Sequence, residues 1–201
     1  MAKKSFYSLD FDKNIKDDFI FLGQYTQESD KMIISDPYYK SKYDKKDFYH
    51  LNHIIENVKQ GSWNTWILRN TGTPAQIVAV YCPHNLTEYP LAADYQFDHA
   101  TWENIGEICV DTGQAGIYDL KYYRDDCNVD GLNLFHDPQN DGDKWFSANC
   151  HVTVNGLCGN IINNGCVANS GWGDGSYAAA ILRNNNKVVG AKIVFIDGND
   201  D

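Results

Sequence analysis

Short apolar runs bounded by turn-forming residues recur along the whole chain, and such runs are typical of β-strands. In the last of them, Val189, Ala191 and Ile193 alternate with smaller or polar residues, which gives the run one apolar face. The segments that fit a strand are 18–23, 31–35, 62–69, 75–82, 105–111, 145–154, 165–172, 176–183 and 187–196. The pattern therefore predicts a protein built mainly from strands.

Three connections between these runs are rich in residues that favour turns. Asn70–Pro74 and Asn184–Asn186 each separate two predicted strands, and both are expected to close hairpins. Asp174-Gly175 has the composition of a tight two-residue turn. With these turns, residues 145–196 are predicted to form an antiparallel meander.

One segment, residues 44–60, has a helical rather than a strand period. Gly61 follows it as a stop signal. The apolar positions that share one helical face are Phe48, Leu51, Ile54, Ile55 and Val58. We expect a mainly β fold with antiparallel sheets, arranged as a sandwich or an open barrel, and one helix at about 44–60.

The length of 201 residues suits one domain with a substantial core. Residues 1–16 are polar and charged, and we interpret them as a flexible N-terminal arm. Residues 17–197 are predicted to form the single domain, and 198–201 an acidic tail.

The chain carries 17 basic and 27 acidic residues, for a formal charge of −10. This balance argues against binding to nucleic acid or to an anionic membrane surface, since both require clustered lysine and arginine. No apolar run is long enough to span a bilayer, and no apolar segment of a secretory signal follows the basic start. We therefore expect a cytoplasmic protein.

Six cysteines are present, and three of them, Cys150, Cys158 and Cys166, are spaced eight residues apart. No Cys-x-x-Cys pair supports a zinc site. Buried free thiols are the favoured interpretation, with a structural zinc as the alternative, and no cofactor is predicted.

Two glycine-rich segments stand out, which we name the middle motif (Asp111–Asp119) and the C-terminal motif (Ser170–Tyr177). The C-terminal motif holds three glycines, a carboxylate, two hydroxyl groups of Ser170 and Ser176, and the Trp172 indole. Glycine at this density indicates special backbone conformations or close approach by another group.

These two motifs, together with Asp36-Pro37-Tyr38 and Gly61-Ser62-Trp63, resemble domain of unknown function 4241 and related uncharacterised bacterial and phage proteins. The resemblance implies one compact β-rich domain in which the motif segments lie near one another. It implies no established reaction.

If these segments converge, one end of the sheet collects acidic, aromatic and hydrogen-bonding side chains. The aromatic rings would form walls for a ligand, and Gln114 and Ser176 would orient it. The alternative is that the aspartates accept hydrogen bonds from the backbone of glycine-rich turns. The candidate ligand-binding residues are Asp36, Tyr38, Asp111, Gln114, Asp119, Trp172, Asp174, Ser176 and Tyr177.

Two classes of function fit this site. The first is a non-catalytic binding module of bacterial or phage origin, with an interaction, immunity-like or ligand-sequestering role, whose partner is a small ligand or another protein. An acidic surface suits a basic partner. The second is a hydrolase-like enzyme that uses the aspartate cluster, with or without Ca²⁺ or Mg²⁺.

Overall fold

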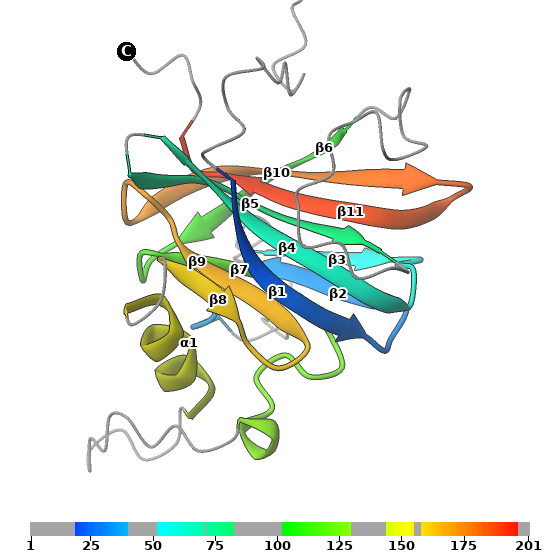
Figure 1. Ribbon diagram of the computed structural model, residues 1–201, viewed down its shortest axis with the longest axis horizontal. Helices are drawn as coiled ribbons and strands as arrows, with labels where there is room; N and C mark the ends of the chain where they lie inside the picture. The colour runs from blue at the N-terminus through cyan, green and yellow to red at the C-terminus, as the bar shows by residue number, and fades with distance from the viewer. Residues whose placement is uncertain are drawn as a thin grey trace, which may run out of the picture.

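The computed structural model of the protein describes residues 19–39, 52–70, 72–82, 102–129, 144–154 and 158–196. These residues form two antiparallel β-sheets stacked face to face (Figure 1). The first sheet has six strands, in the order β1 (Phe19–Gln27), β4 (Gly61–Asn70), β5 (Thr73–Tyr81), β11 (Lys187–Val194), β10 (Gly175–Asn184) and β6 (Glu103–Val110). The second has five, in the order β3 (Asn52–Glu56), β2 (Lys31–Ser35), β7 (Gln114–Asp119), β9 (Gly165–Asn169) and β8 (Gly159–Ile161). The mainly β, antiparallel architecture predicted from the sequence is confirmed in its sandwich form.

The core lies between the two sheets because each strand places alternate side chains on that side. In β2, Met32 and Ile34 belong to this core while Ile33 faces the other way, and all three are fully buried. Ala115 and Ile117 of β7 repeat the pattern. The five-stranded sheet is therefore apolar on both faces, so its outer face also needs a cover.

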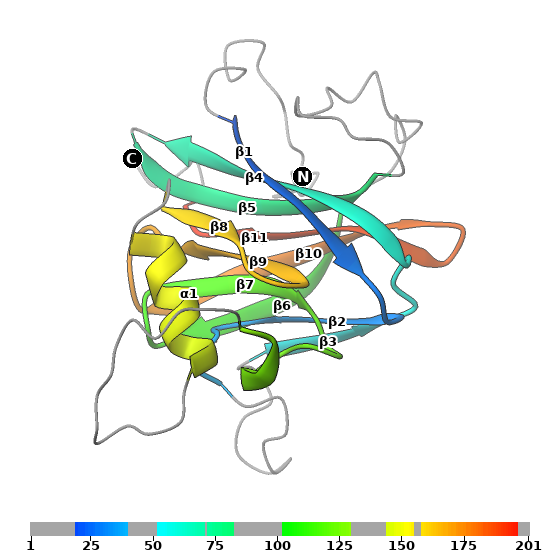
Figure 2. The ribbon, with the colours of Figure 1, turned by 60° about the horizontal axis from the view of Figure 1, so that its bottom comes forward.

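That cover is the one α-helix of the described residues, α1 (Lys144–Val154), which lies across the outer face of the five-stranded sheet (Figure 2). Trp145 packs edge-on against Tyr118 and Tyr123, with ring centroids 5.3 and 5.7 Å apart. The Asp126 carboxylate accepts a hydrogen bond from the Trp145 N–H at 2.8 Å and so binds a free donor of the first helical turn.

Tyr118 provides a test of this helix–sheet contact. Its buried hydroxyl donates to Asn149 Oδ1 of α1 at 2.9 Å. Tyr118→Phe is expected to lower the free energy of unfolding by about 1–2 kcal/mol, because it leaves a buried acceptor with one partner fewer. The matched change Tyr122→Phe removes a hydroxyl that binds the exposed Glu28, and we expect less than about 0.5 kcal/mol. Urea titrations of both variants measure the difference, and equal losses would contradict it.

The structure corrects three predictions about local structure. The helix predicted over 44–60 is wrong where the structure describes it, because Asn52–Glu56 is strand β3; residues 44–51 lie outside the described ranges. The strand predicted over 145–154 is α1, whose buried residues Trp145, Ala148, Asn149 and Thr153 have helical spacing.

The predicted meander is wrong at its second turn. Strand β9 pairs with β7 and β8 in the five-stranded sheet, whereas β10 belongs to the six-stranded sheet. Asp174 therefore ends a connection between the sheets, Gly175 begins β10, and the pair closes no hairpin. The other two hairpins are confirmed: β4 pairs with β5 and β10 with β11, and Asn185 and Asn186 adopt φ values of 49° and 63° in the second turn.

Candidate functional site

The two glycine-rich motifs lie side by side at one end of the sandwich. Asp111–Gly113 leads from β6 to β7, and Ser170–Asp174 leads from β9 to β10, so both segments cross from one sheet to the other. The Ser170 N–H donates to the Gly113 carbonyl at 2.9 Å, and Val110 pairs with Gly175. With the turn Asp36–Tyr39 that follows β2, these segments form what we call the motif end.

Asp36 holds the motif end together. Its fully buried carboxylate accepts hydrogen bonds from the N–H groups of Asp111 and Thr112, each at 2.9 Å, and from the Thr112 hydroxyl. It also accepts from the Tyr38 N–H at 2.8 Å. Burial raises the pKa of the Asp36 carboxyl, and these hydrogen bonds oppose that rise. Asp36 thus binds turn amides, as the alternative interpretation of the aspartates expects.

Asp111 has a different partner. The Tyr39 hydroxyl donates to Asp111 Oδ2 at 2.5 Å. Burial raises the pKa of the Tyr39 phenol, and the carboxylates of Asp111 and Asp36 raise it further, so the phenol stays protonated and remains a donor. The remainder of the Asp111 side chain is exposed to solvent.

Two residues that sequence reasoning missed fix the Asp36–Tyr39 turn. The Tyr123 hydroxyl lies within hydrogen-bonding distance of the carbonyls of Asp36 and Tyr39, at 2.8 and 2.6 Å. Arg124 Nη1 donates to the carbonyls of Pro37 and Tyr38, at 3.0 and 2.6 Å. Both follow β7 directly in sequence, but no pattern in the sequence shows that their side chains reach across to β2.

Trp172 is the most exposed aromatic side chain at the motif end, with 69% of its surface accessible. The loop that carries it is fixed by its own hydrogen bonds. Its N–H donates to the Ser170 carbonyl at 2.8 Å, and the Ser170 hydroxyl donates to the Gly173 carbonyl at 2.5 Å. Gly171 has φ +71°, and a Cβ there would lie 2.5 Å from the Pro74 carbonyl oxygen. The indole is therefore presented to solvent on a well-defined backbone.

Tyr38 is the second exposed aromatic residue of the motif end, at 52% accessible. Its ring packs edge-on against Phe146 of α1, with centroids 5.5 Å apart. Tyr177, in contrast, is buried, because its ring packs against Phe195 at 5.4 Å and its hydroxyl donates to the Gly173 carbonyl at 2.8 Å. Tyr177 therefore helps to fix the Ser170–Asp174 loop from its buried side.

The remaining predicted residues divide between surface and interior. Asp174 and Ser176 are exposed, and the Ser176 hydroxyl donates to the Glu107 carboxylate of β6 at 2.7 Å. Gln114 is only 7% accessible. Its Nε2 lies 3.2 Å from Cys150 Sγ of α1, and its enclosed Oε1 accepts no hydrogen bond from the residues that the structure describes.

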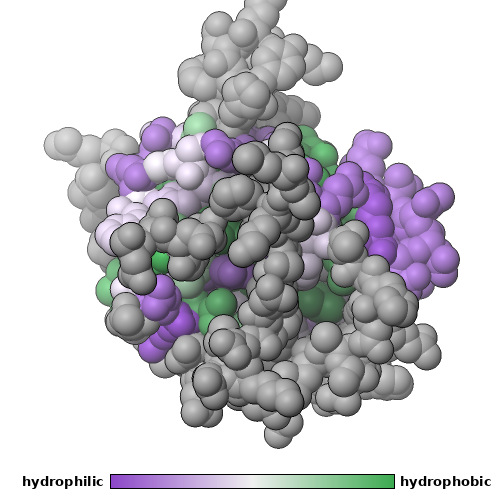
Figure 3. Space-filling view, turned by 90° about the horizontal axis from the view of Figure 1, so that it is seen from above, coloured by the Kyte–Doolittle hydropathy of each residue, from purple (hydrophilic) through white to green (hydrophobic). Residues whose placement is uncertain are grey.

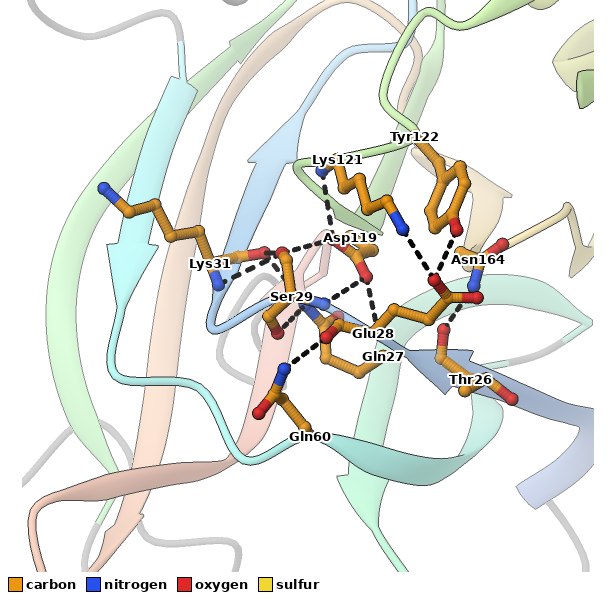
Figure 4. Close-up of polar contacts among 10 residues, drawn as sticks. All are labelled: Thr26, Gln27, Glu28, Ser29, Lys31, Gln60, Asp119, Lys121, Tyr122 and Asn164. Atoms are coloured by element: carbon orange, nitrogen blue, oxygen red, sulfur yellow. Dashed lines mark hydrogen bonds and ion pairs between the residues drawn. The ribbon is translucent and has the colours of Figure 1, made fainter. Parts of the chain in front are cut away.

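Asp119 does not belong to this site. It ends β7, whereas Gln114 begins that strand, and five residue steps of about 3.3 Å place the two about 17 Å apart. The Asp119 carboxylate accepts from the N–H groups of Glu28, Ser29 and Lys121 at 2.6, 2.9 and 3.0 Å, and from the Ser29 hydroxyl (Figure 4). It therefore fixes the β1–β2 turn at the far end of the sheet.

Three exposed carboxylates lie at or next to the motif end among the residues that the structure describes. They are the carboxylates of Asp111, Asp174 and Glu107, whereas the guanidinium of Arg124 donates to backbone carbonyls. Desolvation, with the carboxylates of Asp111 and Glu107, raises the pKa of the neighbouring Cys109 thiol, so this cysteine is not an activated nucleophile.

None of the six cysteines forms a disulfide bond with another. Cys82 and Cys166 are buried, and burial raises the pKa of Cys166 to about 12. Within the described ranges, no group of three or more histidine, cysteine or acidic side chains is arranged to hold a metal ion. Within the same ranges, no helix is long and apolar enough to cross a bilayer.

The described residues thus define a two-sheet antiparallel sandwich with a fixed, acidic, aromatic-bearing loop cluster at one end. Its sequence matches one known family over residues 26–193, and the chain belongs to that family, described as Protein of unknown function (DUF4241). The resemblance seen in the motifs is confirmed by this match. No curated protein and no solved structure matches the chain.

Proposed function

We propose that the protein is a binding module whose motif end takes a cationic group, such as a lysine or arginine side chain of a basic protein partner. The observation that carries the proposal is the exposed Trp172 indole on a loop held by its own hydrogen bonds, beside exposed carboxylates. The proposal also includes three expectations from the sequence: a bacterial or phage origin, a cytoplasmic location, and an immunity-like or sequestering role.

The loop geometry supports binding because it lowers the entropy cost of association. A large aromatic side chain on a pre-ordered backbone needs little further ordering when a partner docks. The hydrogen bonds of Ser170 and Tyr177 to the Gly173 carbonyl provide that order. Tyr38, held by its contact with Phe146, extends the aromatic surface of the same end.

The chemistry of the surface favours a cation as the ligand. Indole is the best of the side-chain π faces for cations, and carboxylates add charge attraction. Asp111 and Asp174 supply those carboxylates, and the net charge of −10 acts in the same direction at long range.

A hydrolase is the less supported alternative. Asp36 uses both carboxylate oxygens on backbone N–H groups and the Thr112 hydroxyl, and Asp119 lies at the other end of β7. Of the aspartates in the predicted cluster, this leaves Asp111 and Asp174 exposed to solvent. A paired acid and base would have to come from these two.

Binding of a labelled ten-residue peptide rich in lysine and arginine tests the proposal. We expect Trp172→Ala and Asp174→Asn each to weaken binding about tenfold, as loss of a cation–π or charge contact implies. Fluorescence anisotropy at low and physiological salt measures the affinity.

Ile54→Ala is the matched control, because Ile54 is a large apolar side chain on edge strand β3 that is also exposed, at 46%. It should bind like the unmodified protein, and all three variants should unfold at the same urea concentration. Equal affinity of Trp172→Ala and the unmodified protein would contradict the proposal.

A further inference from the structure

The exposed carboxylates of the motif end differ in how many of their oxygen atoms are already bound. The Tyr39 hydroxyl donates to Asp111 Oδ2 at 2.5 Å, and the Ser176 hydroxyl donates to Glu107 Oε2 at 2.7 Å. Asp174 is exposed, and none of the described residues donates a hydrogen bond to its carboxylate. Asp174 therefore presents two acceptor oxygens side by side, whereas Asp111 and Glu107 each have one oxygen already engaged.

The strand register brings the two aspartates of this surface together. Val110 is paired with Gly175, so Asp111 and Asp174 occupy the next positions beyond this pair. The two loops stay in contact there, because a Cβ at Gly113 would lie 3.9 Å from Gly173 Cα. Like charges placed opposite each other destabilise a pair of strands, and a cation bound between them relieves that repulsion.

Trp172 lies two residues before Asp174 on the same fixed loop, and its indole is 69% accessible. The face of an indole attracts a cation, whereas a carboxylate binds N–H donors that lie in its own plane. A ligand that uses both groups at once must present a flat face to the ring and an edge of N–H donors to the carboxylate.

A guanidinium group meets both conditions. Its N–H donors lie in one plane and match the two oxygens of a carboxylate, and its faces remain available for stacking on an aromatic ring. An ammonium group is a compact and strongly hydrated charge with no such face. We propose that the motif end selects arginine over lysine, with the guanidinium stacked on Trp172 and donating from its edge to both Asp174 oxygens. This inference rests on the binding function proposed above.

The other end of β10 has a different character. The β10–β11 turn, which is the hydrophilic region at the right of Figures 1 and 3, is flanked by the basic side chains of Arg183 and Lys187. Arg183 is paired with the Glu103 carboxylate of β6 at 3.0 Å. A partner's arginine is therefore attracted to the motif end rather than to this turn, and Glu103 provides a control.

Two labelled peptides of equal length and charge test the inference on the full chain. One carries arginine and the other carries lysine at the same positions of a glycine–serine background. We expect the arginine peptide to bind about tenfold more tightly at physiological salt, because only its side chains can stack and donate in a fork at the same time. Fluorescence anisotropy measures both affinities.

Variants of the two contact residues locate the preference. Trp172→Ala removes the stacking face, and Asp174→Asn leaves one acceptor oxygen in place of two, so each should reduce the preference for arginine to about twofold or less. Glu103→Gln is the matched control, because it neutralises an exposed carboxylate at the far end of the same pair of strands. It should keep the full preference.

The outcomes separate this inference from the function on which it rests. Equal binding of the two peptides, with both weakened by Trp172→Ala, would overturn the selection of arginine and leave the binding function in place. An arginine preference that survives both Trp172→Ala and Asp174→Asn would overturn it too, because the preference would then arise elsewhere. If neither peptide binds, the proposed function itself is wrong, and the inference with it.

Discussion

Replacing Asp119 with alanine is expected to lower the free energy of unfolding by about 3–4 kcal/mol. The fully buried carboxylate accepts from three backbone N–H groups and from the Ser29 hydroxyl, which also lies 2.8 Å from the Lys31 carbonyl. The alanine variant removes this acceptor from all three N–H groups at once. Equilibrium unfolding in urea, followed by circular dichroism, measures the loss.

Asp174→Ala is the matched control for this prediction. Asp174 is exposed, so its truncation should change the free energy of unfolding by less than about 0.5 kcal/mol. Binding of the basic peptide should show the reverse order, with Asp174→Ala weakened and Asp119→Ala unchanged wherever it is folded. If both variants lost the same stability, the Asp119 carboxylate would not be the cap of the turn.

Lys192→Met is expected to raise the free energy of unfolding by about 3 kcal/mol at pH 7. A pKa lowered from 10.5 to about 8 means that folding disfavours the charged amine by about 1.4 kcal/mol per pH unit of that difference. Below pH 8 the amine is charged in both the folded and unfolded states, and the full cost applies. Methionine has similar length and carries no charge.

The pH dependence of this gain follows from the same shift. Between pH 8 and 10.5 the unfolded chain binds more protons at Lys192 than the folded one, so the unmodified protein gains stability as pH rises. The advantage of Lys192→Met should shrink by about 2 kcal/mol between pH 7 and 9.5. Lys187→Met, at the exposed β10–β11 turn, is the matched control and should change the free energy of unfolding by less than about 0.5 kcal/mol. An advantage that is constant with pH would mean that Lys192 keeps an ordinary pKa.

The sequence predicts the strands well where a period of two coincides with strong turn signals. The β10–β11 hairpin is correct because Asn185 and Asn186 tolerate positive φ, and β4–β5 because its loop is rich in turn formers. The sequence-based prediction fails where too few apolar residues are present to distinguish the helical period from the strand period. Ile54 and Ile55 are adjacent, and adjacent residues fit a helix face or a strand equally; in β3, Ile55 is buried and Ile54 exposed.

The sequence pattern does not indicate helix α1, for a related reason. Its β-branched and aromatic residues, such as Phe146, Val152 and Thr153, favour strands by propensity. What decides the outcome is tertiary packing, because Trp145 and Ala148 fill the outer face of the five-stranded sheet against Tyr118. No local pattern shows that this face lacks a cover.

The residues of the predicted site are likewise placed correctly in part. Asp36, Asp111 and the C-terminal motif do lie together, because both motifs cross between the sheets at one end. The sequence places Asp119 close to Gln114 in the same motif, but a strand separates residues by more than 3 Å at each step. Partners such as Tyr123 depend on contacts between residues far apart in the chain, which one sequence does not record.

The order in which the chain builds its sheets has a consequence for folding kinetics. It passes from one sheet to the other at β1–β2, β3–β4, β6–β7 and β9–β10, so neither sheet comes from one continuous segment. Strand β1, at the edge of its sheet, must wait for β4 before it is paired, and β7 must wait for β9 before it is paired on both sides. Chains dominated by such distant pairings lose conformational entropy on closing long loops before the stabilising contacts form. Such chains therefore fold slowly. A truncated chain released early from synthesis would hold unpaired strand edges from both sheets and no finished layer of either.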